Sequence, residues 1–165
     1  MNFSLEIGPQ TDLKTLPTLK DIYITFLPGG DYKETASKAD ELVKEGFNPI
    51  PHFPARSLEN EAQLKEYIKI CEDVGVKQAL VIGGSRDPVG DFDSSIQLLE
   101  TGYFEKMKIG IAGHPEGSPD ISDSKLEKAM KDKKPYADYI ITQWLLDAQP
   151  IIDFISKQTV PVHVG

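Results

Sequence analysis

Three histidines are the side chains of this chain best suited to acid–base or metal chemistry. His52, His114 and His163 each lie at the end of a short apolar run, where a β-strand would end. Imidazoles in such places serve as proton donors, proton acceptors and metal ligands. No His-x-His pair occurs, so we assign no metal ligand, and a metal-dependent barrel hydrolase that uses the three histidines stays an alternative.

A carboxylate interrupts the first apolar run of the chain. Glu6 lies inside Phe3–Ile7, among residues that otherwise favour a buried strand. A carboxyl group that is removed from water has a raised pKa, which suits a general acid. The alternative is a strand-end glutamate that faces solvent.

Gly-rich and Pro-rich loops follow several of the apolar runs. The segment Gly83–Gly90 would let backbone N–H groups approach a phosphate or a flat ring, although it has neither a P-loop nor a full GxGxxG pattern. His114–Pro119 contains two prolines, which restrict its conformations. Gln143 offers amide donors and an acceptor to a heterocycle, and the adjacent Trp144 is suited to stacking or to a core.

Seven short β-type runs would position these residues. They are Phe3–Ile7, Ile22–Leu27, Asn48–Phe53, Gln78–Gly83, Lys108–Gly113, Asp138–Thr142 and Val160–Val164. Segments with helical periodicity lie between most of them: Tyr32–Glu45, Ser57–Val74 with Ser57 as its N-cap, Phe92–Phe104, Ser122–Lys134 and Ala148–Lys157.

Alternation of strands and helices with a period of about 30 residues predicts an α/β fold with a parallel sheet. An open doubly wound sheet and a (β/α)8 TIM barrel are both compatible with this period, and the polar residues at the strand ends favour the barrel. A complete barrel takes ~250 residues. We therefore predict one domain over residues 1–165, an incomplete barrel of about seven strands without its C-terminal βα units.

Composition excludes several classes of protein. The 165 residues carry 18 Lys+Arg against 26 Asp+Glu, a formal net charge of −8, which argues against a nucleic-acid partner. The apolar runs are far shorter than the ~20 residues of a membrane-spanning helix, and no signal peptide is evident. The single cysteine, Cys71, excludes an internal disulfide, and we expect a cytoplasmic protein.

Taken in order, these motifs resemble those of the methylenetetrahydrofolate reductase family over almost the whole chain. The matching segments are Asn2–Pro9, Pro51-His52, Gly83-Gly84, Gly113–Glu116 with Pro119, and Ala137–Gln143 with Asp147. The last segment is the most specific, because it is similar to the family's Ala-Asp/Asn-x-x-Ile-Thr-Gln-x-x-x-Asp signature.

The resemblance implies an FAD-containing barrel of one-carbon metabolism and methionine biosynthesis. Such enzymes pass a hydride from NAD(P)H to flavin and then to 5,10-methylenetetrahydrofolate, giving 5-methyltetrahydrofolate. By this resemblance Glu6 is the proton donor near the pterin, and Gln143 hydrogen-bonds the pterin. The same resemblance places these residues against the flavin: Thr25, His52, Gly83, Gly84, Ser85, Asp87 and His114.

The chain also departs from the family pattern. Gly83-Gly84-Ser85 stands where many members have Arg-Gly-Asp, which leaves Asp87 as the nearest acid, and Ser118 stands where many have histidine. The family's phosphate-binding lysine has three candidate matches, Lys131, Lys133 and Lys134.

Two further interpretations stay open beside the hydrolase. One is a flavin-free, folate-dependent one-carbon protein, which the missing acid favours. The other is a non-catalytic, incomplete barrel. Missing strands would expose sheet edges and apolar surface, so we expect a homo-oligomer.

Overall fold

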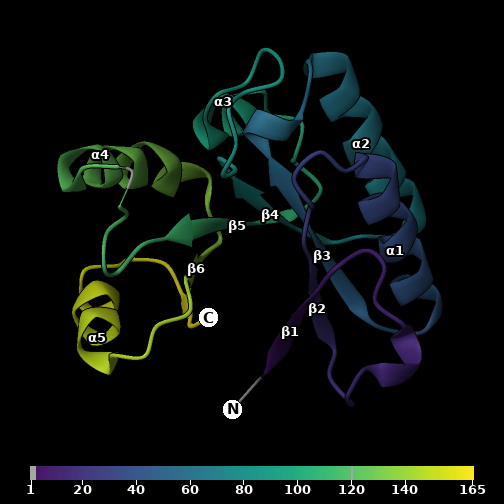
Figure 1. Cartoon of the computed structure of the whole chain (residues 1–165), viewed down its shortest axis with the longest axis horizontal. Coiled ribbons are helices and arrows are strands. Elements are labelled where there is room, and N and C mark those ends of the chain that lie inside the picture. The colour runs from purple at the N-terminus through teal and green to yellow at the C-terminus, as the bar shows by residue number, and fades with distance from the viewer. Residues whose placement is uncertain (1–2, 120) are drawn as a thin grey trace. The chain divides into compact units, whose positions relative to one another are not determined.

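The computed structural model describes residues 3–119 and 121–165, and the chain divides into two compact units, Met1–Lys108 and Ile109–Gly165 (Figure 1). The first unit contains β1 (Ser4–Ile7), a 3-10 turn (Leu13–Thr15), β2 (Asp21–Ile24), α1 (Tyr32–Lys44), β3 (Asn48–Pro54), a 3-10 turn (Ala55–Ser57), α2 (Glu61–Val74), β4 (Gln78–Ile82) and α3 (Ser95–Glu100). The second contains most of β5 (Lys108–Gly113), then α4 (Asp123–Lys133), a 3-10 turn (Lys134–Tyr136), β6 (Tyr139–Thr142), α5 (Ala148–Ser156) and β7 (Val162–His163).

All strand pairs within each unit are parallel, and the spatial order follows the sequence order. In the first unit β1 pairs with β2, β2 with β3, and β3 with β4. In the second unit β5 pairs with β6, and β6 with β7. Parallel neighbours require crossover connections, which the intervening helices and loops supply. The seven predicted strands are confirmed, with ends that differ by a few residues.

Alternation along the strands separates two faces of the sheet in the first unit. Phe53 points toward the helices, because its ring stacks on Tyr67 of α2 with a centroid distance of 4.1 Å. Both side chains are fully buried, and each contributes roughly 2–3 kcal/mol of hydrophobic stabilisation. Because successive side chains of a strand point to opposite faces, the neighbouring His52 faces away from these helices.

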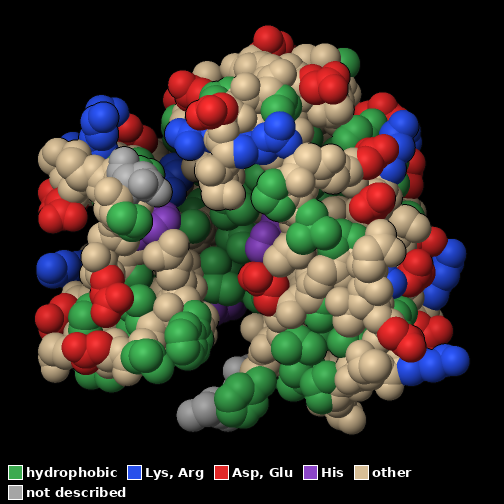
Figure 2. Space-filling view, in the orientation of Figure 1, with side chains coloured by type: hydrophobic (Ala, Val, Ile, Leu, Met, Phe, Trp, Pro, Cys, Tyr) green, Lys and Arg blue, Asp and Glu red, His purple; other side chains and the backbone are tan. Residues whose placement is uncertain are grey.

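The helices α1 and α2 of the first unit turn charged residues outward (Figure 2). Exposed ion pairs one helical turn apart, such as Lys44–Asp40 and Lys69–Asp73, lie on this surface. Each such pair stabilises its helix by only ~0.3–0.5 kcal/mol. The outward charges therefore serve mainly to keep this surface solvated.

The start of α2 differs from the prediction. Ser57 belongs to the 3-10 turn Ala55–Ser57, and Asn60 caps the helix, its side-chain oxygen accepting a hydrogen bond of 3.0 Å from the Gln63 amide. Leu58, directly after this turn, is completely buried. The chain enters the core at this residue, and the helix begins only after it. The helix ends as predicted at Val74, and the following Gly75 has a φ of +98°, a left-handed conformation that favours glycine.

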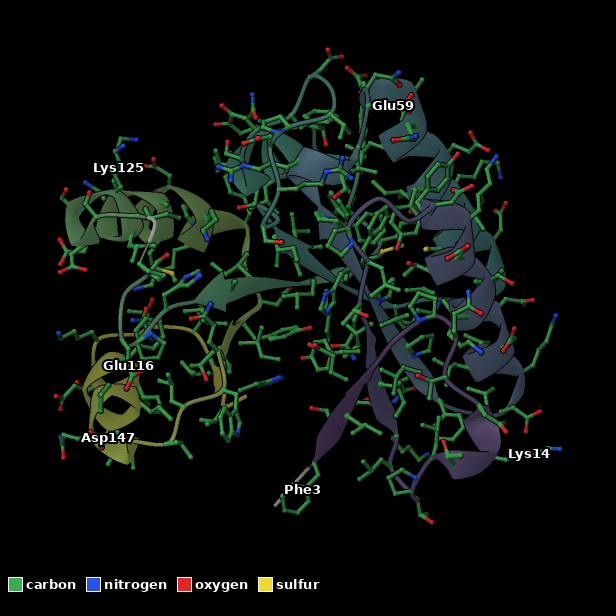
Figure 3. The ribbon with its side chains drawn as sticks, in the orientation of Figure 1. Phe3, Lys14, Glu59, Glu116, Lys125 and Asp147 are labelled. Carbon is green, nitrogen blue, oxygen red and sulfur yellow. The ribbon has the colours of Figure 1, made fainter. Side chains whose placement is uncertain are left out.

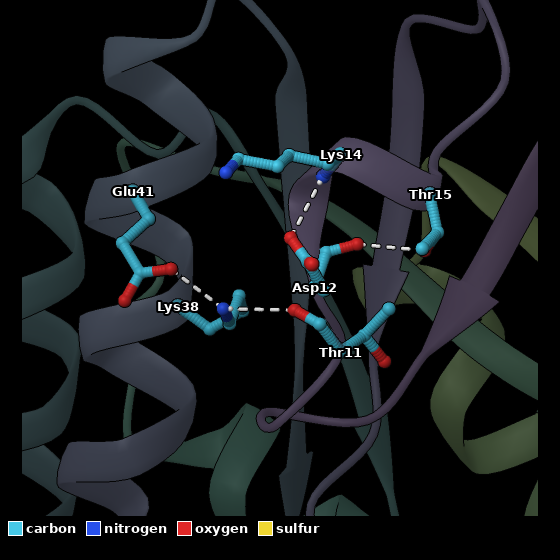
Figure 4. Close-up of polar contacts among 6 residues, drawn as sticks. All are labelled: Thr11, Asp12, Lys14, Thr15, Lys38 and Glu41. Atoms are coloured by element: carbon cyan, nitrogen blue, oxygen red, sulfur yellow. Dashed lines mark hydrogen bonds and ion pairs between the residues drawn. The ribbon is translucent and has the colours of Figure 1, made fainter.

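A buried lysine attaches the β1–β2 connection to α1 (Figure 4). The Nζ of Lys38 donates a hydrogen bond of 3.1 Å to the Thr11 carbonyl and lies 2.5 Å from Glu41 Oε2. The Lys38 side chain is only 10% exposed, so both contacts are needed to compensate its loss of hydration. This arrangement fixes the loop that leads from β1, the strand of Glu6, into β2.

Candidate functional site

Three of the predicted site residues lie at the carboxyl ends of β1, β2 and β3. Glu6 is the third residue of β1 and pairs in register with Tyr23 of β2. Thr25 comes directly after β2, and both its backbone N–H and its Oγ1 donate to the Ile7 carbonyl, at 2.9 and 3.1 Å. The Thr25 side chain therefore ties the end of β2 to the end of β1.

Glu6 and His52 come together across this edge. Glu6 Oε2 lies 3.7 Å from His52 Nε2, although β2 separates their strands. The His52 side chain is 9% exposed and that of Glu6 is 59% exposed. The pair thus combines a buried imidazole with a carboxyl group that water can reach.

Burial sets the protonation of both groups. Removal from water lowers the pKa of His52 to about 4, so this imidazole is neutral at pH 7. Partial desolvation raises the pKa of the Glu6 carboxyl above its usual value. The pair therefore consists of a neutral imidazole and a carboxyl group that keeps its proton to a higher pH than an ordinary glutamate does.

The predicted Gly-rich loop follows β4 and is held against the end of β3. The Arg56 amide donates to the Gly83 carbonyl at 3.0 Å, and the Val89 amide donates to the Arg56 carbonyl at 3.1 Å. Gly84 has a φ of +92°, which requires glycine. A Cβ added at Gly83 would meet nothing within 4 Å, so the backbone there is open to a ligand.

The remaining residues of this loop are placed differently. Ser85 and Asp87 are both exposed, and neither contacts Glu6 or His52 through a hydrogen bond or ion pair in the described part of the chain. The sequence therefore correctly placed a glycine turn after β4. The suggestion that Asp87 replaces the family's acid stays a prediction.

In the second unit, His114 follows β5 and lies near a buried lysine. The Lys133 side chain reaches the Ala112 carbonyl, with Nζ 3.4 Å from the oxygen, and the residue is 8% exposed. Desolvation and the positive charge of Lys133 both lower the pKa of His114, and burial lowers the pKa of Lys133 itself. The sequence left Lys131, Lys133 and Lys134 as equal candidates, and burial separates Lys133 from the other two.

Gln143 comes directly after β6, and its amide N–H donates to the Gly113 carbonyl at 3.3 Å. Its side chain is exposed, and Trp144 beside it is 73% exposed rather than part of a core.

The loops after β5 and β6 can be followed in Figure 3 at the labelled Glu116 and Asp147. Asp147 caps α5 by accepting a hydrogen bond of 3.0 Å from the Gln149 amide.

The third histidine has a different environment. His163 lies in β7, is exposed, and stacks on the ring of Tyr139 with a centroid distance of 4.4 Å and an interplanar angle of 17°. Within residues 3–119 and 121–165, no three His, Cys, Asp or Glu side chains gather in a way that could hold a metal ion. In the same residues, no helix has the length and apolar character needed to span a bilayer.

Similar solved structures share the fold at very low sequence identity. A putative phosphonomutase from Burkholderia cenocepacia aligns with a TM-score of 0.65 and 12% identity over 99% of this chain and 77% of that chain. The ligand-free form of a tryptophan synthase from M. tuberculosis aligns with a TM-score of 0.59 and 9% identity, covering 99% and 73%. These likenesses confirm the predicted α/β fold of the TIM-barrel type, with seven parallel strands in the described residues.

Sequence comparison identifies the family. "Methylenetetrahydrofolate reductase 1" of Schizosaccharomyces pombe is 26% identical over 150 residues, which cover 81% of this chain and 24% of that protein. The chain therefore spans about a quarter of the length of this curated relative. The sequence profile named "Methylenetetrahydrofolate reductase" matches residues 12–162. With nine-tenths of its residues inside that match, the chain belongs to the methylenetetrahydrofolate reductase family.

Proposed function

We propose that this chain carries the proton-donating and flavin-facing part of an active site that reduces 5,10-methylenetetrahydrofolate to 5-methyltetrahydrofolate. The observation that carries the proposal is the Glu6–His52 pair, with 3.7 Å between Oε2 and Nε2 at the carboxyl ends of β1 and β3. Membership of the family supports it. Because the chain spans 24% of the curated relative, the activity of the whole protein is part of the proposal.

Glu6 is the proton donor in this proposal. The methylene bridge of the substrate must open to an electrophilic iminium before a hydride can arrive, and opening requires a proton on the departing nitrogen. The raised pKa of Glu6 keeps a proton available closer to neutral pH. Its 59% exposure lets solvent replace the proton after transfer.

Several features of the first unit fit a flavin. The backbone at Gly83 is open, and Gly84 takes a φ of +92°, so the loop after β4 lets a flat ring approach its N–H groups closely. When bound, FAD supplies the hydride, with NAD(P)H as the source of electrons. In the first unit, the residues that would hold it are Thr25, His52, Gly83, Gly84, Ser85 and Asp87.

Lys133 is the lysine that we propose to bind the flavin phosphate. A largely desolvated ammonium group binds a phosphate oxygen more strongly than one that is fully hydrated. Among the residues that the structure describes, the Lys133 ammonium keeps one weak contact, to the Ala112 carbonyl at 3.4 Å. Gln143, which is exposed after β6, is assigned to the pterin on the family resemblance.

The first experiment is an absorbance spectrum of the purified chain after addition of FAD and desalting. Retained flavin bands support the proposal. Lys133→Met should then weaken FAD binding about tenfold or more, since a charge-assisted hydrogen bond contributes ~1.5–3 kcal/mol. The matched control Lys131→Met alters an exposed lysine two residues away and should bind FAD as the unaltered chain does.

The purified chain with FAD also tests the role of Glu6 as the proton donor. If flavin is retained, Glu6→Gln should keep the flavin spectrum and slow oxidation of the reduced flavin by methylenetetrahydrofolate about 10²-fold or more. A chain that never retains FAD contradicts the flavin assignment. Binding of a folate by such a colourless chain would favour the flavin-free, folate-dependent alternative, which the missing acid at Ser85 already suggests.

A further inference from the structure

The fold leaves one buried polar atom of the first unit without a partner. His52 Nε2 has no hydrogen bond within the described residues, and the side chain that carries it is 9% exposed. More than nine in ten buried polar groups in proteins are hydrogen-bonded, so an exception requires an explanation. Glu6 Oε2, at 3.7 Å, is a polar atom just beyond hydrogen-bond distance.

The imidazole is held by its neighbours, and the exposed carboxyl group has room to rotate. His52 pairs in register with Leu80 of β4, its carbonyl accepts a hydrogen bond of 3.1 Å from the Tyr67 hydroxyl, and its ring meets the Tyr23 ring edge-on at 6.3 Å. Glu6 has an exposed side chain whose terminal torsion is broad. A small rotation of Glu6 is therefore enough to close the gap to Nε2.

The neighbours of His52 determine which of the two groups holds the proton. The titratable side chains that meet it are Glu6 from β1, Tyr23 from β2 and Tyr67 from α2, whose hydroxyl donates to the His52 backbone carbonyl. No lysine or arginine forms an ion pair with Glu6 in the described chain, so no cation stabilises its ionised form. Burial puts the pKa of His52 at about 4, and the pKa of Glu6 is raised, so the first proton that the pair binds belongs to Glu6.

We propose that His52 is a positioning residue whose unprotonated Nε2 accepts a hydrogen bond from the protonated Glu6 carboxyl. This contact holds the proton on Glu6 and fixes the direction of the O–H bond. When Glu6 gives its proton away, the Oε2–H bond breaks, the carboxylate is left ionised, and a proton from solvent restores the pair. The inference deepens the proposed function and rests on it for the role of Glu6 as proton donor.

The test is the pKa of Glu6, measured by NMR titration of the chain with 13C-labelled glutamate, with the signal assigned from the Glu6→Gln variant. His52→Phe keeps a ring of similar shape and removes the acceptor, so the pKa of Glu6 should fall by roughly half a unit to one unit. His52→Gln can place an amide oxygen near the position of Nε2 and should restore most of the shift. Ile50→Val, a same-face packing change two residues earlier in β3, should leave the pKa unchanged.

An unchanged or higher pKa in His52→Phe, or no restoration in His52→Gln, overturns the proposal. If His52→Phe does not fold, as judged by circular dichroism, the 15N shift of Nε2 in the unaltered chain decides. At a pH where the titration shows Glu6 to be protonated, an Nε2 that carries no proton supports the proposal, and an Nε2 that carries one contradicts it. None of these measurements needs flavin or folate, so failure of the proposed function and failure of this inference can be told apart.

Discussion

Environment gives the three histidines different chemistry, although each ends a similar apolar run. His52 on β3 is buried, and its removal from water lowers its pKa to about 4. His114 after β5 is half-buried, and desolvation together with the charge of Lys133 lowers its pKa. His163 is exposed and stacks on Tyr139. The residue type alone could not distinguish these cases, because depth of burial depends on which strands and helices surround the position.

The buried His52 makes stability depend on pH. The unfolded chain binds a proton at this histidine near pH 6.5, whereas the folded chain does so only near pH 4. The unfolded state therefore binds more protons between these values, and the folded state loses stability as the pH falls through this window. From pH 7 to pH 5 the contribution of His52 to the free energy of unfolding should fall by about 2 kcal/mol.

Urea unfolding of the unaltered chain and of His52→Gln at pH 7, 6 and 5 measures this effect. The difference in free energy of unfolding between the two proteins should change with pH by about 2 kcal/mol. His114 is present in both proteins, so its contribution cancels. A difference that stays constant with pH would falsify the assignment of a neutral, buried His52.

At the scale of elements, loops determine how the strand ends are held. The loop after β4 is attached to the β3–α2 connection by the Asp91 amide, which donates to the Glu59 carbonyl at 2.9 Å, and by Arg56 Nε, which donates to the Asp93 carbonyl at 2.8 Å. Local sequence patterns predicted the strands and helices that this loop joins. They did not predict these contacts, because the hydrogen bonds join residues 32 and 37 positions apart in the sequence.

Gly90 is the tightest point of this loop. A Cβ at Gly90 would overlap the Glu59 carbonyl, so the chain must move away and lose the neighbouring hydrogen bond. We expect Gly90→Ala to lower the free energy of unfolding by about 1–3 kcal/mol. Gly83→Ala in the same loop adds a Cβ that meets nothing within 4 Å, and thermal unfolding should show little change. Equal effects of the two substitutions would contradict this account.

Lys38 should contribute more to stability than any exposed lysine of α1. Lys38→Met leaves the Thr11 carbonyl without its hydrogen bond and removes the partner of Glu41, so we expect a loss of about 1–3 kcal/mol. The matched control is Lys44→Met, which removes a 70% exposed lysine and its ion pair with Asp40. That control should change stability by no more than ~0.5 kcal/mol. Chemical denaturation of both variants measures the contrast.

At the scale of the whole molecule, the second unit exposes several large apolar side chains. Trp144 is 73%, Leu146 89% and Ile152 56% exposed, and α5 buries only Ile151 among its described residues. Large exposed apolar side chains of this kind favour association. They support the sequence-based expectation of a homo-oligomer, which stays a prediction together with the single domain over residues 1–165.

Light scattering over a range of concentrations measures the oligomeric state. We expect a dimer or larger species for the unaltered chain, and a shift toward monomer in Ile152→Glu, which places a charge on the exposed side of α5. Glu127→Gln on α4 changes an exposed charge and should leave the distribution as it is. A compact monomer at high concentration would contradict the prediction of a homo-oligomer.

The sequence by itself determined the repeating βα pattern, the seven strands, most helix ends and the family. These features depend on short-range periodicity, on caps such as Gly75, and on motifs such as Ala137–Gln143. Only the tertiary structure decided that Asn60 rather than Ser57 caps α2, that Lys133 is the buried lysine, and that Glu6 meets a neutral His52. The physical reason is that burial and contact between distant residues set hydration and pKa, and the folded packing of strands and helices creates both.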